Sequence, residues 1–373
     1  MDKISVLACG DFVADNPSLV RISEEFQNKL NGSDLNICNF EAPISGEWKA
    51  LPKSGPSLAQ SPDSPGVLEK MGFNVVLMAN NHIMDYGVDA FKATISSFRN
   101  SLVVGAGKAS EAYSCKIVTV KGKKIGLLAF CQYEFGIIES KSDSGKTGVA
   151  WVNSLDIPNL LKNAKEKCDF VLVFPHAGLE DIDAPLPIWK QNYRKLVEWG
   201  ADAVIASHPH VPQGWEVYQG KPIFYSLGNF YFDVLGGNDY WNKGLIVELI
   251  LGETIDFKVY NTIFSKDGII KFDYSDEIIQ HNEELLALLL DDKKYSGYID
   301  EECQRRYRVY TYSILRGLGG IAWSNLSLKM IIRLIILSFI NNKDKETLMN
   351  TLRCETHRWV YERCLIISNN NGK

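Results

Sequence analysis

The sequence predicts an α/β fold in which a largely parallel sheet is covered by helices on both faces. Up to about residue 270, short apolar runs alternate with amphipathic stretches, which is typical of this class. The runs are almost continuously apolar, and this indicates strands that are buried on both sides. We interpret these runs as strands: ISVLA (4–8), LNICNF (35–40), VVLMA (75–79), KIGLLAF (124–130), DFVLVF (169–174), DAVIAS (202–207) and PIFYSLG (222–228).

The segments between and after these runs complete the predicted elements. Residues 17–30 and 186–200 are amphipathic and are expected to form helices, the second ending at Gly200 as a C-cap. GLIVELIL (244–251) and IDFKVYNTIF (255–264) predict further strands, which we expect to be antiparallel. We therefore predict one domain over residues 1–272.

The remaining residues, 273–373, are predicted to form a helical, basic extension. Residues 277–294 have helical periodicity. From Cys303 onward the chain has 12 Lys and Arg against 4 Asp and Glu, whereas the preceding part has 28 against 41. The apolar segment 326–340 contains Lys329 and Arg333 and is too short for a membrane span. We expect a buried helix there, and the alternative is an interfacial helix that contacts anionic membrane.

The composition is that of an ordinary globular protein, with 46% hydrophobic and 23% charged residues. The net charge of −5 gives no reason to expect nucleic-acid binding. The eight cysteines are scattered without a CxxC pair, so we expect reduced thiols. The start, MDKISVLACGDF, contains no signal-peptide pattern. We accordingly expect a cytoplasmic location. The alternative is a location peripheral to the membrane, with contact through the basic tail.

Five of the predicted strands end in polar residues that can bind a metal ion. In open α/β sheets, ligands bind at the carboxyl ends of the strands. Four of the six histidines lie at these ends, while His281 and His357 lie in the helical extension. The residues at the five ends are Asp11; Asn39 and Glu41; Asn80, Asn81, His82 and Asp85; His176 and Glu180; and His208 and His210.

Imidazole, carboxylate and amide groups together suit one or two divalent ions such as Mn, Zn, Fe or Mg. No cysteine lies in these clusters, which argues against a structural thiolate zinc site. The extended spacing of His208-Pro209-His210 is expected to direct both imidazoles toward one region. Each residue alone has another explanation: Asp11 and Asp85 as helix N-caps, Asn39 and Asn80 as turn residues, Glu180 as a solvated charge. Their joint occurrence favours a metal site.

The same segments resemble the motifs of the CapA family of bacterial capsule and poly-γ-glutamate synthesis proteins. In chain order these are GDF, NFEAP, ANNHIMDYG, HAGLE and the long run SHPHVPQGWEVYQGKPIFYSLGNFYFD, and the resemblance covers about residues 3–265. It implies a metallophosphoesterase-like fold, with a four-layer α/β/β/α sandwich and metal ions at the sheet edge. The extension after about residue 275 is not covered.

The resemblance also implies a role for each matching residue. Glu41 corresponds to the carboxylate that bridges two ions; Asn81, His176 and His208 complete one ion, and Asp11 and His210 the other. His82 corresponds to the histidine that protonates the leaving oxygen, and Asp85 would orient it. Substrate contacts are predicted for Asn39, Asn80, Glu180 and Asn229. One position departs from calcineurin-like enzymes, because Val13 stands where they have a histidine. The alternatives for the Asp11 ion are then weaker binding, water ligands in place of the histidine, or absence.

The predicted function is a metal-dependent hydrolase, phosphoesterase-like, that acts in capsule, poly-γ-glutamate or exopolysaccharide biosynthesis. Its nucleophile would be metal-activated water, its general acid His82, and its substrate an anionic or phosphorylated small molecule or polymer. The loop of residues 46–66, rich in Pro, Ser and Gly, is predicted to border the site as a specificity lid. The alternative is a non-catalytic, metal-binding accessory subunit of a capsule-synthesis complex.

Overall fold

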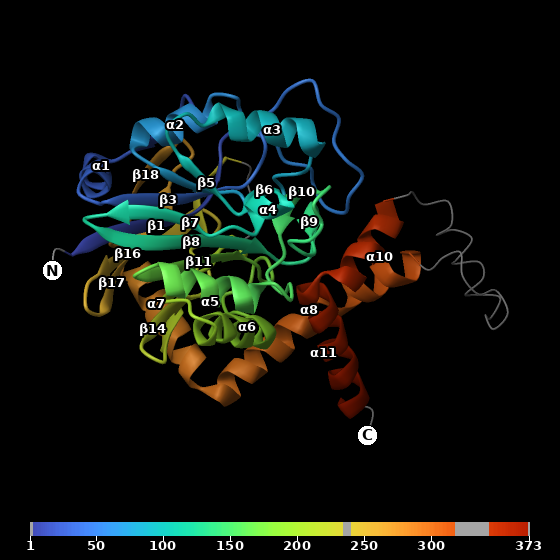
Figure 1. Ribbon diagram of the computed structural model, residues 1–373. Coiled ribbons are helices and arrows are strands. Elements are labelled where there is room, and N and C mark those ends of the chain that lie inside the picture. Colours follow the sequence, from blue (N-terminus) through green and yellow to red (C-terminus); the bar gives the residue numbers. More distant parts are fainter. Residues whose placement is uncertain (1–2, 234–239, 318–342, 372–373) are drawn as a thin grey trace.

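The computed structural model describes residues 3–233, 240–317 and 343–371, and its body consists of two large sheets stacked between helices (Figure 1). The first sheet has the strand order β2-β18-β17-β16-β1-β3-β4-β5, with β15 also paired to β1. Parallel pairing joins β1, β3, β4 and β5, whereas β16 and β17 are antiparallel as predicted. Its strands are β1 (Ile4–Val13), β2 (Arg21–Ile22), β3 (Leu35–Phe40), β4 (Val75–Leu77), β5 (Leu102–Val104), β15 (Asn229–Phe232), β16 (Lys243–Leu251), β17 (Ile255–Phe264) and β18 (Ile269–Phe272).

The second sheet has the order β13-β14-β12-β11-β8-β7, in which β8, β11, β12 and β14 are parallel. A small sheet, β6-β10-β9, lies beside it. The strands of these two sheets are β6 (Ala106–Lys108), β7 (Lys116–Val120), β8 (Lys123–Cys131), β9 (Ile137–Ile138), β10 (Thr147–Ala150), β11 (Phe170–His176), β12 (Ala203–Ile205), β13 (Trp215–Tyr218) and β14 (Lys221–Phe224).

Helices cover the outer faces of the stacked sheets. In Figure 1, α2 and α3 lie above the first sheet, and α5 and α6 lie below the second. One core cluster joins residues of both sheets, such as Ile37 and Leu172, so the sheets pack face to face. This is the predicted α/β/β/α arrangement, and the fold class is confirmed. The helices of the body are α1 (Glu24–Asn31), α2 (Ser64–Met71), α3 (Gly87–Ser97), α4 (Ala109–Ala112), α5 (Ile157–Lys167) and α6 (Pro187–Glu198).

The first predicted helix is wrong in its N-terminal half. Helix α1 begins at Glu24, where the Ser23 side chain accepts a hydrogen bond from the Phe26 N–H and caps the helix. Arg21 and Ile22 instead pair with β18 as a short strand. The second predicted helix is confirmed, since α6 ends just before Gly200, which has a φ of +122°.

The extension after residue 273 is helical as predicted, but it packs into the body. Its helices are α7 (Asp276–Leu290), α8 (Asp292–Gly317), α10 (Lys343–Arg353) and α11 (Glu355–Asn371). Tyr295, Cys303 and Val360 belong to the same core cluster as Trp189 of α6. The last strand in the described residues ends at Phe272, close to the predicted boundary, and the division into two domains stays a prediction.

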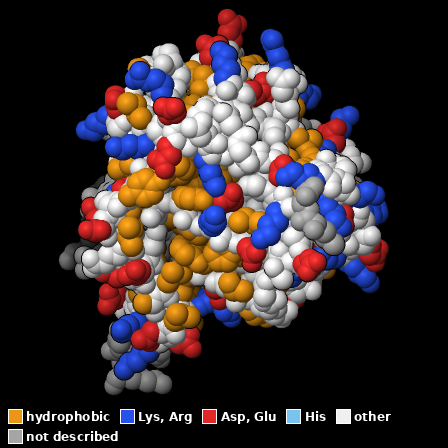
Figure 2. Space-filling model, turned by 90° about the vertical axis from the view of Figure 1, so that its left-hand side faces the viewer, with side chains coloured by type: hydrophobic (Ala, Val, Ile, Leu, Met, Phe, Trp, Pro, Cys, Tyr) orange, Lys and Arg blue, Asp and Glu red, His pale blue; other side chains and the backbone are white. Residues whose placement is uncertain are grey.

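Three observations bear on the predicted membrane contact. The apolar segment 326–340 lies outside the described residues. Among the residues that are described, no helix is both long and apolar enough to span a membrane. The face on the left-hand side of Figure 1 mixes basic and acidic side chains around a band of hydrophobic ones (Figure 2).

Candidate metal centre

The polar strand ends meet in space because their strands run parallel within each sheet. Asp11 lies in β1, and Glu41 directly follows β3. His176 is the last residue of β11, and the residues after β12 carry His208 and His210. All of these side chains are almost completely buried, as is Asn81 in the loop after β4. The structure therefore brings the six predicted metal ligands together at one edge of the stacked sheets.

Glu41 lies at the centre of this group. Its Oε1 atom is 3.6 Å from Nε2 of His176 and 3.6 Å from Nε2 of His210. The residue is 0% exposed, and neither carboxylate oxygen has a hydrogen-bond partner among the described residues. A buried polar group that lacks a partner is rare in folded proteins, because it loses its water without compensation.

Two ligand groups share Glu41. The first consists of Glu41, His176 and His208, and the second of Asp11, Glu41 and His210. Nδ1 of His210 is 3.5 Å from Oδ2 of Asp11, and the Asn81 Oδ1 atom is 3.0 Å from Nε2 of His176. These are the two groups that the resemblance implies, with Asn81 beside the first. Metal binding itself stays a prediction.

The protonation chemistry of these residues fits a divalent cation. Burial and the neighbouring Asp11 raise the pKa of Glu41 well above its ordinary range, and burial also raises the pKa of Asp11. Burial and the adjacent imidazoles lower the pKa of His176 and of His208 well below the usual value. The neutral imidazoles can each donate a lone pair to a metal ion, and the carboxylates next to them lack compensating charge. A divalent ion would bind the imidazoles and supply that charge.

The two imidazoles of the His208-Pro209-His210 segment lie together, but the backbone conformation that places them is not the extended one that was predicted. His208 has a φ of +103° and His210 a φ of +62°, so the backbone is not extended. Non-glycine residues seldom adopt positive φ, and such strain is often found at functional sites. The His208 N–H donates to Oδ2 of Asp11 at 3.2 Å, which helps to hold this conformation.

His82 lies at the side of the centre and is held by two buried groups. Its Nδ1 atom is 2.7 Å from Oδ2 of Asp85 and 3.2 Å from Nζ of Lys53. Lys53 also donates to Oδ1 of Asp85. Burial lowers the pKa of His82; Asp85 acts in the opposite direction, and the Lys53 charge adds to the lowering. The expected contact between His82 and Asp85 is present, while sequence reasoning missed Lys53.

Three of the four residues predicted to contact substrate are hydrogen-bonded to the candidate metal ligands or to one another. Asn39 donates to Oδ1 of Asp11 at 2.7 Å, and the Asn229 Oδ1 atom is 3.0 Å from Nδ1 of His210. The Asn80 amide bonds to Asn39 and to backbone groups. These positions favour orientation of the ligands over the substrate contact expected from sequence. Glu180 fits its prediction better, because its half-exposed side chain lines the cavity described next.

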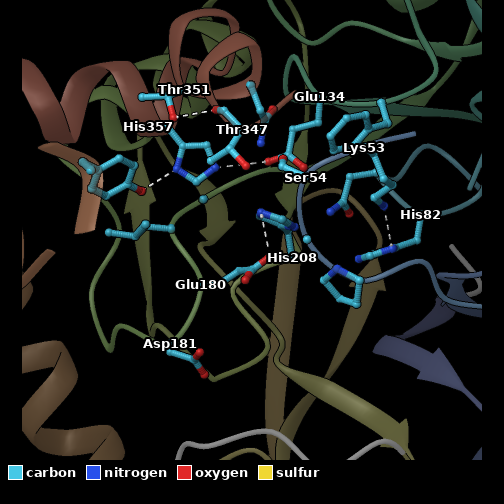
Figure 3. A pocket seen from close by; sticks show the side chains of 18 of the residues that line it. Lys53, Ser54, His82, Glu134, Glu180, Asp181, His208, Thr347, Thr351 and His357 are labelled. Atoms are coloured by element: carbon cyan, nitrogen blue, oxygen red, sulfur yellow. Dashed lines mark hydrogen bonds and ion pairs between the residues drawn. The ribbon is translucent and has the colours of Figure 1, made fainter. Parts of the chain in front are cut away.

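A cavity of about 410 Å³ opens beside His82 and His208 (Figure 3). Part of the loop 46–66 forms one wall, which agrees with its predicted position. The helical extension forms another wall, with Arg306 and Tyr310 from α8 and His357 from α11. Sequence reasoning missed this contribution, since these wall residues follow the last recognisable motif, which ends at Asp233, by more than 70 residues and carry no pattern that links them to it.

Together, the stacked sheets and the buried histidine–carboxylate centre define an α/β protein with a candidate two-ion site at its sheet edge. The chain belongs to the family described as bacterial capsule synthesis protein PGA_cap, whose model matches residues 6–234. The family expected from the motifs is thus confirmed.

The curated relatives include two capsule proteins. The chain is 36% identical over 214 residues to the PGA biosynthesis protein CapA of Bacillus subtilis, which covers 55% of this chain and 54% of that protein. It is 32% identical over 212 residues to the capsule biosynthesis protein CapA of Bacillus anthracis, which covers 55% and 52%. The chain therefore spans about half the length of the curated relatives it matches.

Solved structures with a similar arrangement include a putative 5'-nucleotidase from Staphylococcus aureus. The TM-score is 0.44 at 16% identity, and the match covers 77% of this chain and 59% of that one.

Proposed function

We propose that the chain is a metal-dependent hydrolase that cleaves a phosphate ester or a related anionic substrate in the synthesis of capsule or another exopolymer such as poly-γ-glutamate. The observation that supports this most strongly is the Glu41 carboxylate, which lies among Asp11 and three histidines and whose two oxygens have no hydrogen-bond partner in residues 3–233, 240–317 and 343–371. The family supports the role in capsule synthesis, and the His82 group beside the centre supports catalysis.

The ligand residues would hold one or two divalent ions, Mn, Zn, Fe or Mg, on either side of Glu41. An ion bound there supplies Lewis-acid chemistry, which activates water as a nucleophile and neutralises charge on the substrate. Asn39 and Asn229 orient Asp11 and His210, respectively, through their amides. Arg306 and Lys53, both of which line the cavity, provide positive charge toward an anionic substrate.

His82 is the residue that would move a proton. Its Nδ1 atom is engaged by Asp85, so the Nε2 atom remains to donate a proton to the leaving oxygen. Asp85 stabilises the protonated ring. The same oxygen, Oδ2, accepts from the Leu58 N–H at 2.8 Å, and Oδ1 accepts from Lys53, so both contacts fix the carboxylate. A positioned general acid of this kind contributes about 10²–10⁴-fold to the rate.

The test is a screen of phosphomonoesters and phosphodiesters with the purified full chain and each of the four ions. We expect His82→Ala to lose about 10²–10⁴-fold in kcat at unchanged metal content. His281→Ala is a matched control, because His281 is also a buried histidine but lies in α7 and does not line the cavity. Full turnover by His82→Ala would contradict the proposed role.

A second candidate is a non-catalytic, metal-binding accessory subunit of a capsule-synthesis complex. Val13 favours it, because this fully buried side chain stands where calcineurin-like enzymes have a histidine ligand. Stoichiometric metal binding without turnover of any ester in the screen would select this candidate. Turnover that depends on His82 would exclude it.

A further inference from the structure

A second group of ligand-type side chains lies in the wall of the cavity, apart from the Glu41 centre. It consists of Glu134, Cys354 and His357, whose ligand atoms all lie within 4.8 Å of one another. Glu134 follows strand β8, Cys354 connects α10 to α11, and His357 is in the first turn of α11. Figure 3 shows Glu134 and His357 facing each other across this wall.

The spacing of the three groups suits a tetrahedral ion. Cys354 and His357 are three residues apart at the start of a helix, which places both on one face. Sγ of Cys354 is 3.6 Å from Oε1 of Glu134, and Nε2 of His357 is 3.9 Å from the same oxygen. Zinc bonds of about 2.0–2.3 Å at tetrahedral angles place ligand atoms roughly 3.3–3.8 Å apart, so small shifts would complete the site.

The surroundings already hold two of the ligands in orientation. The Tyr310 hydroxyl is hydrogen-bonded to Nδ1 of His357, which leaves Nε2 directed toward Glu134. The Gln132 amide donates to Oε1 of Glu134 at 2.8 Å. The Tyr310 contact is to the ring nitrogen that would not bind the ion, which is typical of metal sites. Gln132 instead holds the Glu134 oxygen that faces Cys354 and His357.

The charge and exposure of the group also favour a cation. The Glu134 side chain is 6% exposed, and among the described residues its ion pair is with His357 and not with a Lys or Arg. The Cys354 residue is fully buried, while the His357 side chain is 26% exposed toward the cavity. Solvent therefore has access to a fourth coordination position.

We propose that Glu134, Cys354 and His357 bind a zinc ion, separate from the Glu41 centre, which fastens the start of α11 to the segment after β8. A thiolate, an imidazole and a carboxylate form a donor set that suits zinc and its spectroscopic substitute cobalt. Two of the three ligands lie beyond residues 6–234, the part that matches the family model, so this site is a feature of the extension.

One side chain connects this site to the Glu41 centre. Gln132 places its Nε2 atom 2.8 Å from Nε2 of His208, and its Oε1 atom accepts from the Thr356 hydroxyl at 2.6 Å. Thr356 lies between Cys354 and His357 in sequence. An ion that fixes the start of α11 would therefore also fix Gln132 against a ligand of the main centre.

The test uses cobalt-loaded full chain, because sulfur-to-cobalt charge transfer absorbs in the near ultraviolet and the Glu41 centre offers only nitrogen and oxygen ligands. We expect the band in the wild type and its loss in Cys354→Ser. Cys364→Ser is the matched control: this buried thiol lies on α11, the helix that Cys354 directly precedes, and it contacts the Cys303 carbonyl oxygen at 3.0 Å. The band should persist in this variant. Elemental analysis should show one equivalent of zinc lost in Cys354→Ser.

Glu41→Gln separates this proposal from the proposed function. It removes the shared carboxylate of the main centre, and we expect it to retain the sulfur-to-cobalt band. Absence of the band in the wild type would overturn the proposal even if the cysteine variants failed to fold. Its persistence in Cys354→Ser would also overturn it.

Discussion

Substitution of Glu41 by Gln should stabilise the metal-free protein, although the residue is fully buried at the centre of the site. Without a cation, the ionised carboxylate accepts no hydrogen bond from the part of the chain that the structure describes, and it lies next to Asp11. Leaving a buried polar group unsatisfied costs about 1–3 kcal/mol, and more when the group is charged. The neutral amide should regain part of this, and the full 1–3 kcal/mol would correspond to roughly 1–4 °C in Tm for a chain of this size.

The sign of this effect should reverse when metal is added. At an ion concentration 100 times Kd, binding stabilises a native protein by about 2.7 kcal/mol. The wild type should gain this increment with Mn²⁺, while Glu41→Gln should gain little of it. The variant is therefore expected to be the more stable protein in EDTA and the less stable one in excess Mn²⁺.

The effect should also depend on pH in a defined direction. Because the pKa of Glu41 is raised in the folded protein, its ionisation costs stability as the pH rises, and no such cost exists below the unfolded value of about 4.3. The advantage of Glu41→Gln in EDTA should then be large at pH 8 and should shrink as the pH falls toward 5.

Thermal unfolding in EDTA and in Mn²⁺, with the EDTA series measured from pH 5 to pH 8, tests the stabilisation, its reversal by metal and its pH dependence. Glu216→Gln is the control with the opposite sign, because the Glu216 carboxylate already pairs with Arg194 at 2.6 Å and accepts from the Tyr225 hydroxyl. Its loss should destabilise the protein with or without metal. A Glu41→Gln variant that is less stable than the wild type in EDTA would refute the reasoning.

Two further substitutions test the groups around the centre. Lys53→Gln removes a positive charge that lowers the pKa of His82, and the pKa of His82 should therefore rise. The alkaline limb of the pH profile of kcat should then move to higher pH. If this limb does not move, His82 does not determine it. Asn229→Ala removes the acceptor at Nδ1 of His210 and should weaken Mn²⁺ binding by about 10–100-fold in a titration, whereas Asn192→Ala on α6 should leave the affinity unchanged.

The α/β class and the group of polar strand ends could be predicted from local patterns, whereas the four-layer arrangement and the choice of metal ligands came from the resemblance to the CapA family. Buried parallel strands have continuous apolar sequences, and their carboxyl ends necessarily share an edge of the sheet. Asp11, Glu41 and His176 could therefore be assigned to one site without knowledge of their distances.

The parts that escaped prediction depend on contacts between distant segments. Arg21 and Ile22 have a helical pattern, but pairing with β18 makes them a strand. Lys53 lies in an irregular loop, and nothing local shows that its amine reaches Asp85. Cys354 and His357 have a suitable spacing in the sequence, yet their partner Glu134 is 220 residues from Cys354. Such pairings become visible only once the chain is folded.

The most direct measurement of the central claim is an anomalous-scattering map from crystals of the full chain grown with Mn²⁺. Two peaks are expected, one on each side of the Glu41 carboxylate and about 3.5–4 Å apart. One peak should lie among His176, His208 and Asn81, and the other between Asp11 and His210. A map without a peak at coordination distance from Glu41 would contradict the assignment of this centre as a metal site.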